Sequence, residues 1–212
     1  MTDAAASKGV EPPKFADALR SGWMTFKSNT KVLVASFGIF LGSSVVLALL
    51  LNLISGSLGP LLTFILSTAS FLPSILLLPG LYSIALKSTR AQKAEIGDLL
   101  LIFKDRFVQH VGLLLLQSCG AMVCLVGAVV SQALFVPGSF MVLDRHMDWD
   151  DAMGRCVEDI KPKLVNWIIF SLVISLVAFA GFLACIVGAL VTGPVALCAW
   201  AYAYEYSFGG RR

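Results

Sequence analysis

The sequence predicts an all-α membrane protein, a polytopic bundle of about six transmembrane helices arranged as three hairpins. Its composition is the first reason, because 58% of the 212 residues are hydrophobic and only 14% are charged. About a quarter of the residues in an ordinary soluble domain are charged. The second reason is that the charges gather in four stretches, which leaves three long uncharged blocks between them: 32–86, 107–143 and 164–204.

Basic residues place all the charged stretches on one side of the membrane. Each of the four stretches contains Lys or Arg, and basic residues in short connections stay on the cytoplasmic side. If both ends of an uncharged block face the cytoplasm, the block crosses the bilayer an even number of times. We therefore predict three hairpins and cytoplasmic N- and C-termini.

The length of each block supports two crossings, although the second block is short. The blocks contain 55, 37 and 41 residues, and a full span needs about 20 residues. In the second block we expect either a turn near Val129 to Gln132, with a short, tilted or re-entrant hairpin, or a second helix that continues through Asp144 toward Met147.

An amphipathic segment precedes each uncharged block. Apolar residues recur in these segments at the spacing of one helical face. The three faces contain Phe15, Ala18, Leu19, Gly22, Trp23 and Phe26; Ile96, Leu99, Leu100, Phe103 and Phe107; and Trp149, Ala152, Met153, Cys156, Val157 and Ile160. An aspartate follows the first position of each face by two residues: Asp17, Asp98 and Asp151. We expect three helices that lie along the cytoplasmic membrane surface.

A proline beside a glycine introduces the last helical stretch of each block, at Pro79, Pro137 and Pro194. Together with the amphipathic segments, these prolines predict an internal triplication, because self-similarity at a fixed period is typical of repeated units. The predicted units are 13–90, 94–147 and 148–207, which form one membrane domain over 13–207 between tails at 1–12 and 208–212. The alternative is that the prolines are unrelated, since proline is tolerated in membrane helices.

Aromatic residues mark the expected membrane interface, where Trp and Tyr are enriched. The candidate interface residues are Trp23, Phe26, Trp149, Trp200, Tyr202, Tyr204 and Tyr206.

The polar residues inside the blocks are few. The blocks contain no Asp, Glu, Lys or Arg, whereas ion-coupled carriers and proton relays place ionisable groups within their spans. The candidate residues for helix breaks or a pore are Pro79, Pro137, Pro194, Gln117 and Gln132. The alternative for both glutamines is that they only bond neighbouring helices.

No pattern for catalysis or cofactor binding is found. His110 and His146 are isolated, and no residues match a catalytic triad or a calcium or zinc site. Asp148, Asp150 and Asp151 are explained as acids at the start of a helix, where its dipole favours negative charge. We expect no enzyme activity, no cofactor and no metal, and the modest net charge of +3 does not indicate nucleic acid.

Several short motifs carry a resemblance to a known group of proteins. They are Asp17-Ala18-Leu19 with Gly22-Trp23-x-x-Phe26-Lys27, Leu78-Pro79-Gly80-Leu81-Tyr82 with Lys87, Asp98-Leu99-Leu100 before Phe103, and Val187 to Val195 before Tyr202-x-Tyr204. The chain resembles a broad, largely uncharacterised group of bacterial six-span membrane proteins related to the membrane domain found beside some glycerophosphoryl diester phosphodiesterases. The resemblance implies a helical bundle in a bacterial inner membrane and supplies no active-site residues. The phosphodiesterase domain itself has no counterpart here.

Two functions are open at this point. The first is a non-enzymatic scaffold or accessory subunit of a membrane complex, whose partners are membrane lipids and another membrane protein or a second copy of the chain. The alternative is a small facilitator or lipid-handling transporter with a path at the proline-containing helices. A polar cavity with Gln117, Gln132 or Asn52 would favour the alternative, and a centre filled by Leu and Ala would favour the scaffold.

Overall fold

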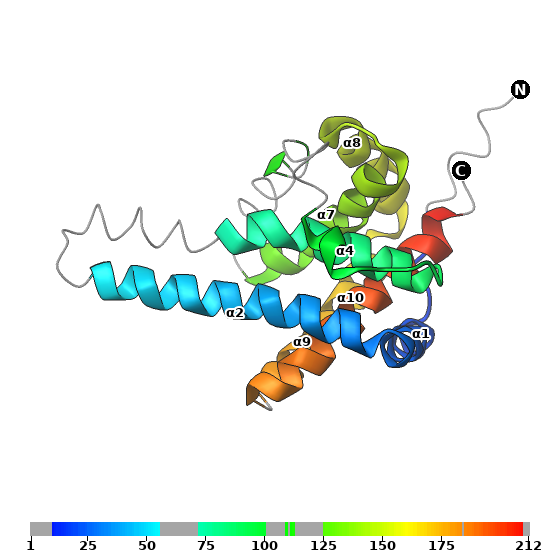
Figure 1. Ribbon diagram of the computed structural model, residues 1–212. Coiled ribbons are helices and arrows are strands. Elements are labelled where there is room, and N and C mark those ends of the chain that lie inside the picture. The colour runs from blue at the N-terminus through cyan, green and yellow to red at the C-terminus, as the bar shows by residue number, and fades with distance from the viewer. Residues whose placement is uncertain are drawn as a thin grey trace, which may run out of the picture.

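The computed structural model describes residues 10–55, 72–100, 109, 111–112, 125–183 and 185–209. Within these ranges every regular element is helical, which confirms the predicted all-α class (Figure 1). The helices are α1 (Phe15–Ser28), α2 (Thr30–Ser55), α4 (Leu72–Thr89), α7 (Leu125–Arg145), α8 (Trp149–Ile160), α9 (Leu164–Leu183) and α10 (Cys185–Phe208), with the 3₁₀ turns η1 (Ile96–Leu99) and η2 (Lys161–Lys163).

Helices α1 and α8 are the predicted amphipathic helices, and each begins at the first residue of its apolar face. The buried residues occupy matching positions in the two helices: Ala18, Gly22 and Phe26 in α1, and Ala152, Cys156 and Ile160 in α8. The second predicted amphipathic segment begins differently, as the single turn η1 with Asp98 and Leu99 buried. Its remaining face positions, Phe103 and Phe107, lie outside the described residues.

Two helical stretches are long and apolar enough to cross a membrane: Thr30–Ile54, and Trp149–Gly181, which joins α8, η2 and α9. The most apolar part of the first is 11% buried and that of the second 28%, whereas the core helix of a soluble protein is mostly buried. Large apolar side chains are exposed along both α2 and α9: Ile39, Val45, Val46, Leu49, Leu50, Leu53 and Ile54, and Val165, Ile169, Leu172, Leu176, Phe179 and Leu183. Such extended apolar surfaces favour an apolar surrounding.

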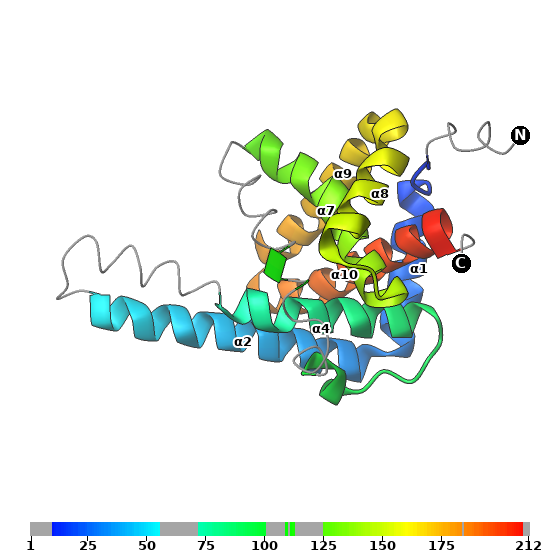
Figure 2. The same cartoon turned by 90° about the horizontal axis from the view of Figure 1, so that it is seen from above.

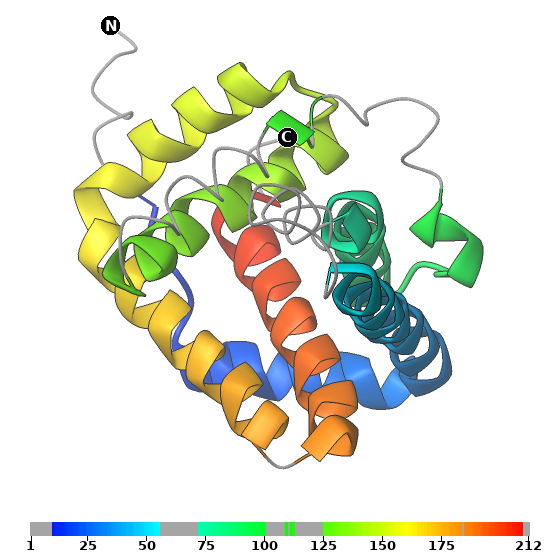
Figure 3. The same ribbon diagram turned by 90° about the vertical axis from the view of Figure 1, so that its left-hand side faces the viewer.

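Helix α10 lies at the centre of the other helices (Figure 3) and packs against α1, α2, α4, α7 and α9. This position buries three of the residues that were predicted to lie at the membrane interface. Phe26, Trp200 and Tyr204 are only 5%, 6% and 1% exposed. They are buried because α1 packs on α10 and the aromatic end of α10 packs on rings from other helices, such as Phe140 against Tyr204 and Phe170 against Trp200.

The remaining predicted interface residues are more accessible. Trp23, Trp149 and Tyr206 are exposed, and Tyr202 is half-buried. Trp23 also stacks on Phe26.

None of the three prolines ends a helix, because Pro79, Pro137 and Pro194 lie inside α4, α7 and α10. Proline removes one backbone hydrogen bond and crowds the preceding turn, but a membrane helix packed among neighbours tolerates it. The turn expected near Val129 to Gln132 is absent, since α7 continues through this segment and through Asp144.

Each proline-containing helix packs closely against one amphipathic segment (Figure 2). Gly80 of α4 lies against the backbone of Leu99 in η1. The Cys156 thiol of α8 donates a hydrogen bond to the Leu134 carbonyl of α7, at 3.0 Å. A methyl group on Gly22 of α1 would lie 2.7 Å from the carbonyl oxygen of Val195 in α10. In chain order, α4 and α7 each pack on the segment that follows them, and α10 packs on the first segment, α1.

Candidate functional site

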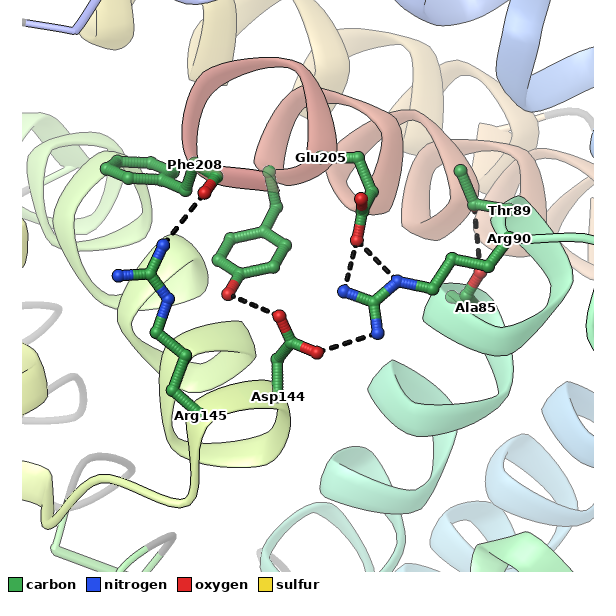
Figure 4. A network of polar contacts seen from close by, with 8 residues as sticks. Ala85, Thr89, Arg90, Asp144, Arg145, Glu205 and Phe208 are labelled. Atoms are coloured by element: carbon green, nitrogen blue, oxygen red, sulfur yellow. Dashed lines mark hydrogen bonds and ion pairs between the residues drawn. The ribbon is translucent and has the colours of Figure 1, made fainter. Parts of the chain in front are cut away.

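The ends of α4, α7 and α10 are joined by a network of charged side chains (Figure 4). Arg90, which follows α4, donates from Nη1 to Asp144 Oδ1 of α7 at 2.6 Å and from Nε to Glu205 Oε1 of α10 at 2.5 Å. Tyr204 of α10 donates its hydroxyl to the other oxygen of Asp144, at 3.1 Å. Arg145 of α7 donates from Nη2 to the Phe208 carbonyl of α10, at 2.8 Å.

The network is largely shielded from solvent. The side chains of Arg90, Asp144 and Glu205 are 18%, 9% and 25% exposed. Burial lowers the pKa of Arg90, but its hydrogen bonds to both carboxylates and their negative charges outweigh burial, so the pKa is raised above its usual value. Arg90 therefore stays charged and holds the three helix ends together.

The charged stretches of the sequence meet at this end of the bundle. The Val10 backbone donates to the Asp159 carbonyl of α8 at 2.9 Å, and Lys163 forms an ion pair with Glu11 at 2.6 Å. Ser207 of α10 donates to the Glu11 carbonyl at 2.9 Å. Residues from all four charged stretches therefore lie together at one end of the described bundle.

Similar contacts reach one residue of each predicted tail. Val10 belongs to the predicted N-terminal tail, but it is 6% exposed and its carbonyl accepts a hydrogen bond from Trp167 at 2.8 Å. Phe208 belongs to the predicted C-terminal tail, but it is fully buried at the end of α10. Both residues are part of the folded bundle.

A cavity of about 500 Å³ lies among α2, α4, α7, α9 and α10. Its lining residues are Phe37, Leu78, Tyr82, Gln132, Val136, Ile174, Ser175, Ala178, Phe179, Gly193, Ala196, Leu197 and Trp200. Leu78, Val136 and Gly193 are the residues that immediately precede the three prolines. The proline-containing segments of α4, α7 and α10 thus surround one common cavity.

Gln132 and Ser175 supply polar groups to this otherwise apolar and aromatic lining. The Ser175 hydroxyl of α9 donates to Gln132 Oε1 of α7 at 2.7 Å. Gln132 was a predicted pore residue, and the structure places it in the cavity wall. Gln117 lies outside the described residues. Asn52 donates to the Ala48 carbonyl of its own helix and is exposed, away from this lining.

The aromatic part of the lining was not predicted. Phe37, Tyr82, Phe179 and Trp200 come from four different helices. Of these residues, only Tyr82 has a signal in the sequence. It lies three residues after Pro79, and another lining residue, Leu197, lies three residues after Pro194. Phe37 and Phe179 join the cavity through tertiary packing, which no local pattern reveals.

The comparisons with known proteins add no relative. No protein-family model, curated protein or solved structure matches the chain. Among the described residues, no group of His, Cys, Asp and Glu side chains is arranged to hold a metal ion. The function is therefore argued from the geometry of the bundle and its cavity.

Proposed function

We propose that this protein is a multi-pass protein of a bacterial inner membrane, with about six spans in three hairpins and both termini in the cytoplasm. The exposed apolar surfaces of α2 and α9 support membrane insertion. The gathering of the charged stretches at one end supports a single cytoplasmic face. The sequence motifs described above support kinship with the bacterial six-span group.

We further propose that 13–90, 94–147 and 148–207 are three copies of one unit. Three observations support the triplication. The residue before each proline lines the same cavity, the buried positions of α1 and α8 match, and each proline-containing helix packs on an amphipathic segment. In a triplicated chain, equivalent positions of the three units would surround a common centre, as these features do.

As its activity, we propose that the protein binds a membrane-soluble molecule in this cavity and acts as a non-enzymatic lipid-handling protein or facilitator. The cavity itself carries the proposal, since its volume falls in the range of about 300–1,000 Å³ that is typical of ligand sites. The Gln132–Ser175 pair and the Tyr82 hydroxyl, set in a largely apolar wall, suit binding and orientation.

The experiment is purification of the tagged protein from native membranes in a mild detergent, with mass spectrometry of the molecules that accompany it. Ala178→Phe fills the cavity, and Ala16→Phe adds the same bulk to an exposed position of α1. We expect a bound molecule in the parent protein and in Ala16→Phe, and its loss in Ala178→Phe. A folded parent protein with no bound molecule would overturn the proposal.

The second candidate is the scaffold or accessory subunit, and the exposed apolar rows of α2 and α9 favour it. Surfaces of this kind can contact another membrane protein or a second copy as well as lipid. The same purification tests it, because an accessory subunit brings a stoichiometric protein partner. In that case Ala178→Phe keeps the partner, whereas charged substitutions on α2 release it.

A further inference from the structure

We infer that the cavity selects a neutral, carbonyl-bearing molecule that dissolves in the hydrocarbon core of the bilayer, of the quinone class, in preference to a phospholipid. The inference rests on the proposed function, since it names the ligand class of the same cavity. It follows from the hydrogen-bonding state of Gln132, its depth along α7 and the aromatic character of the walls.

The side chain of Gln132 has an unused hydrogen-bond donor, its Nε2 amide group. The Ser175 hydroxyl already donates to Gln132 Oε1. An amide nitrogen carries two N–H donors, and among the described residues none accepts a hydrogen bond from Gln132 Nε2. A donor left unpaired away from water is unfavourable. A ligand with a carbonyl oxygen would pair this donor, and a pure hydrocarbon would not.

Tyr82 adds a second donor to the cavity wall from a different helix. Its side chain is 5% exposed and lines the cavity. Its hydroxyl has no hydrogen-bond partner among the residues that the structure describes. A ring with two carbonyl oxygens offers acceptors to donors from both α4 and α7.

The depth of Gln132 distinguishes between membrane molecules. Gln132 precedes Asp144 by twelve residues of continuous helix, which corresponds to about 18 Å at 1.5 Å per residue. Asp144 belongs to the charged network at the helix ends, which lies at the polar boundary of the membrane. Because the hydrocarbon core is about 30 Å thick, Gln132 lies near its middle.

Ser175 of α9, the hydrogen-bond partner of Gln132, lies at the same depth in the bilayer. Ser175 follows the first residue of α9, Leu164, by eleven residues, or about 17 Å. Phospholipid ester carbonyls remain near the interface with their headgroups, so they do not reach this level. A neutral molecule without a charged headgroup dissolves in the core and does.

The walls fit a planar ring that arrives from the lipid side. Phe37, Tyr82 and Trp200 provide aromatic faces, and rings of this kind attract other rings by stacking. Phe179 lines the cavity and is also 59% exposed, in the apolar row along the outside of α9. The cavity therefore extends to a surface that faces lipid.

The test measures binding to the full-length protein in lipid nanodiscs by isothermal titration calorimetry, with protein-free nanodiscs as the blank. The probes are a decyl-substituted benzoquinone and decylbenzene, which has the same chain length and no carbonyl oxygen. We expect the quinone to bind about tenfold more tightly, which corresponds to one well-placed hydrogen bond. Gln132→Met keeps the length of the side chain but removes the donor, and it should remove most of this preference while decylbenzene binding stays unchanged.

Tyr82→Phe serves as a second variant, because it keeps the ring and removes only the hydroxyl. We expect it to weaken quinone binding a fewfold with unchanged decylbenzene binding. Asn52→Leu, which changes a polar residue of α2 outside the cavity, should behave as the parent protein. Thermal unfolding of each variant shows whether it is folded.

The outcomes separate this inference from the proposed function. Equal binding of both probes, or a co-purified phospholipid that the quinone does not displace, would overturn the quinone inference and leave the binding function standing. If neither probe binds and Ala178→Phe changes nothing that accompanies the purified protein, both proposals fail.

Discussion

Arg90 and Glu205 lie 115 residues apart in the chain and form an ion pair in which the guanidinium donates from Nε at 2.5 Å. Each residue follows the proline of its own segment, Pro79 or Pro194, by eleven positions. Arg90 also contacts Asp144 at the end of α7. A single guanidinium therefore joins the ends of all three proline-containing helices.

Loss of Arg90 should strongly destabilise the bundle. In Arg90→Met the carboxylates of Asp144 and Glu205 are left close together and largely buried, and removal of one partner from a buried ion pair costs about 3–5 kcal/mol. The measurement is thermal unfolding in detergent. The triple variant Arg90→Met, Asp144→Asn, Glu205→Gln should recover much of the loss, and equal destabilisation of both proteins would contradict this explanation.

The stabilising charge of Arg90 should not depend on pH in the ordinary range. Because its pKa is raised in the folded protein, the stabilisation is fully present below the ordinary pKa of arginine, and it is lost only as the pH rises through the raised pKa of the folded state. Arg90→Lys keeps a charge but loses the two-armed geometry. We expect an intermediate stability for Arg90→Lys, with a gap to the parent protein that is constant between about pH 7 and 9.

Gly22 should tolerate no larger residue, because α1 and α10 touch at this point. A methyl group in Gly22→Ala would lie 2.7 Å from the Val195 carbonyl oxygen and 3.0 Å from the Ala199 nitrogen. We expect a loss of about 2 kcal/mol in the free energy of unfolding. Gly154→Ala in α8 is the matched control, since it meets nothing within 4 Å and should gain about 1 kcal/mol from helix propensity. A loss in both variants would argue against close packing as the cause.

The three aspartates of the amphipathic segments should differ in importance despite their matching positions. Asp98 is buried, and its carboxylate accepts hydrogen bonds from the Glu95 backbone at 3.0 Å and from Lys87 at 2.8 Å. Asp17 and Asp151, in contrast, are exposed. Because Lys87 is partly exposed, we assign most of the effect to the backbone bond and expect Asp98→Ala to cost about 2 kcal/mol. Asp17→Ala and Asp151→Ala should each cost less than about 1 kcal/mol. Urea or thermal unfolding of the three variants makes the comparison.

A charge on the outer face of α2 should interfere with membrane insertion. Val46 is 56% exposed in the middle part of this apolar helix, and a lysine near the centre of a span costs about 2.5–3.5 kcal/mol. We expect Val46→Lys to lower the fraction of protein that resists alkaline extraction from membranes. Ser28→Lys, at an exposed position next to the charged end of the bundle, should leave it unchanged. Normal insertion of Val46→Lys would place this face of α2 away from lipid.

The amphipathic helices were predictable because their signals are local. The apolar period begins at Phe15 and Trp149, and α1 and α8 begin there too. The placement of the aromatic end of α10 was not predictable in the same way. Trp200 and Tyr204 have the composition of an interfacial belt, but the rings of Phe140 and Phe170 cover them, and this depends on the packing of helices far apart in the chain.

In the candidate site, too, local signals were predictable and contacts between distant helices were not. Gln132 was identified because a polar residue in an apolar block is costly and needs a partner. Its partner Ser175 could not be identified, since serines are scattered through the third block and only the packing of α7 on α9 selects one. Pro79, Pro137 and Pro194 were expected at helix breaks, but α4, α7 and α10 continue past them because neighbouring helices surround these segments.

The contact of α10 with α1 makes the chain close on itself. An open array of repeats has exposed end units that need special caps, and it can grow by adding another repeat. Here the face of α10 around Val195 and Ala199 is already covered by Gly22 of α1. A further helical segment could reach this face of α10 only by displacing α1, so the contact leaves no open end there.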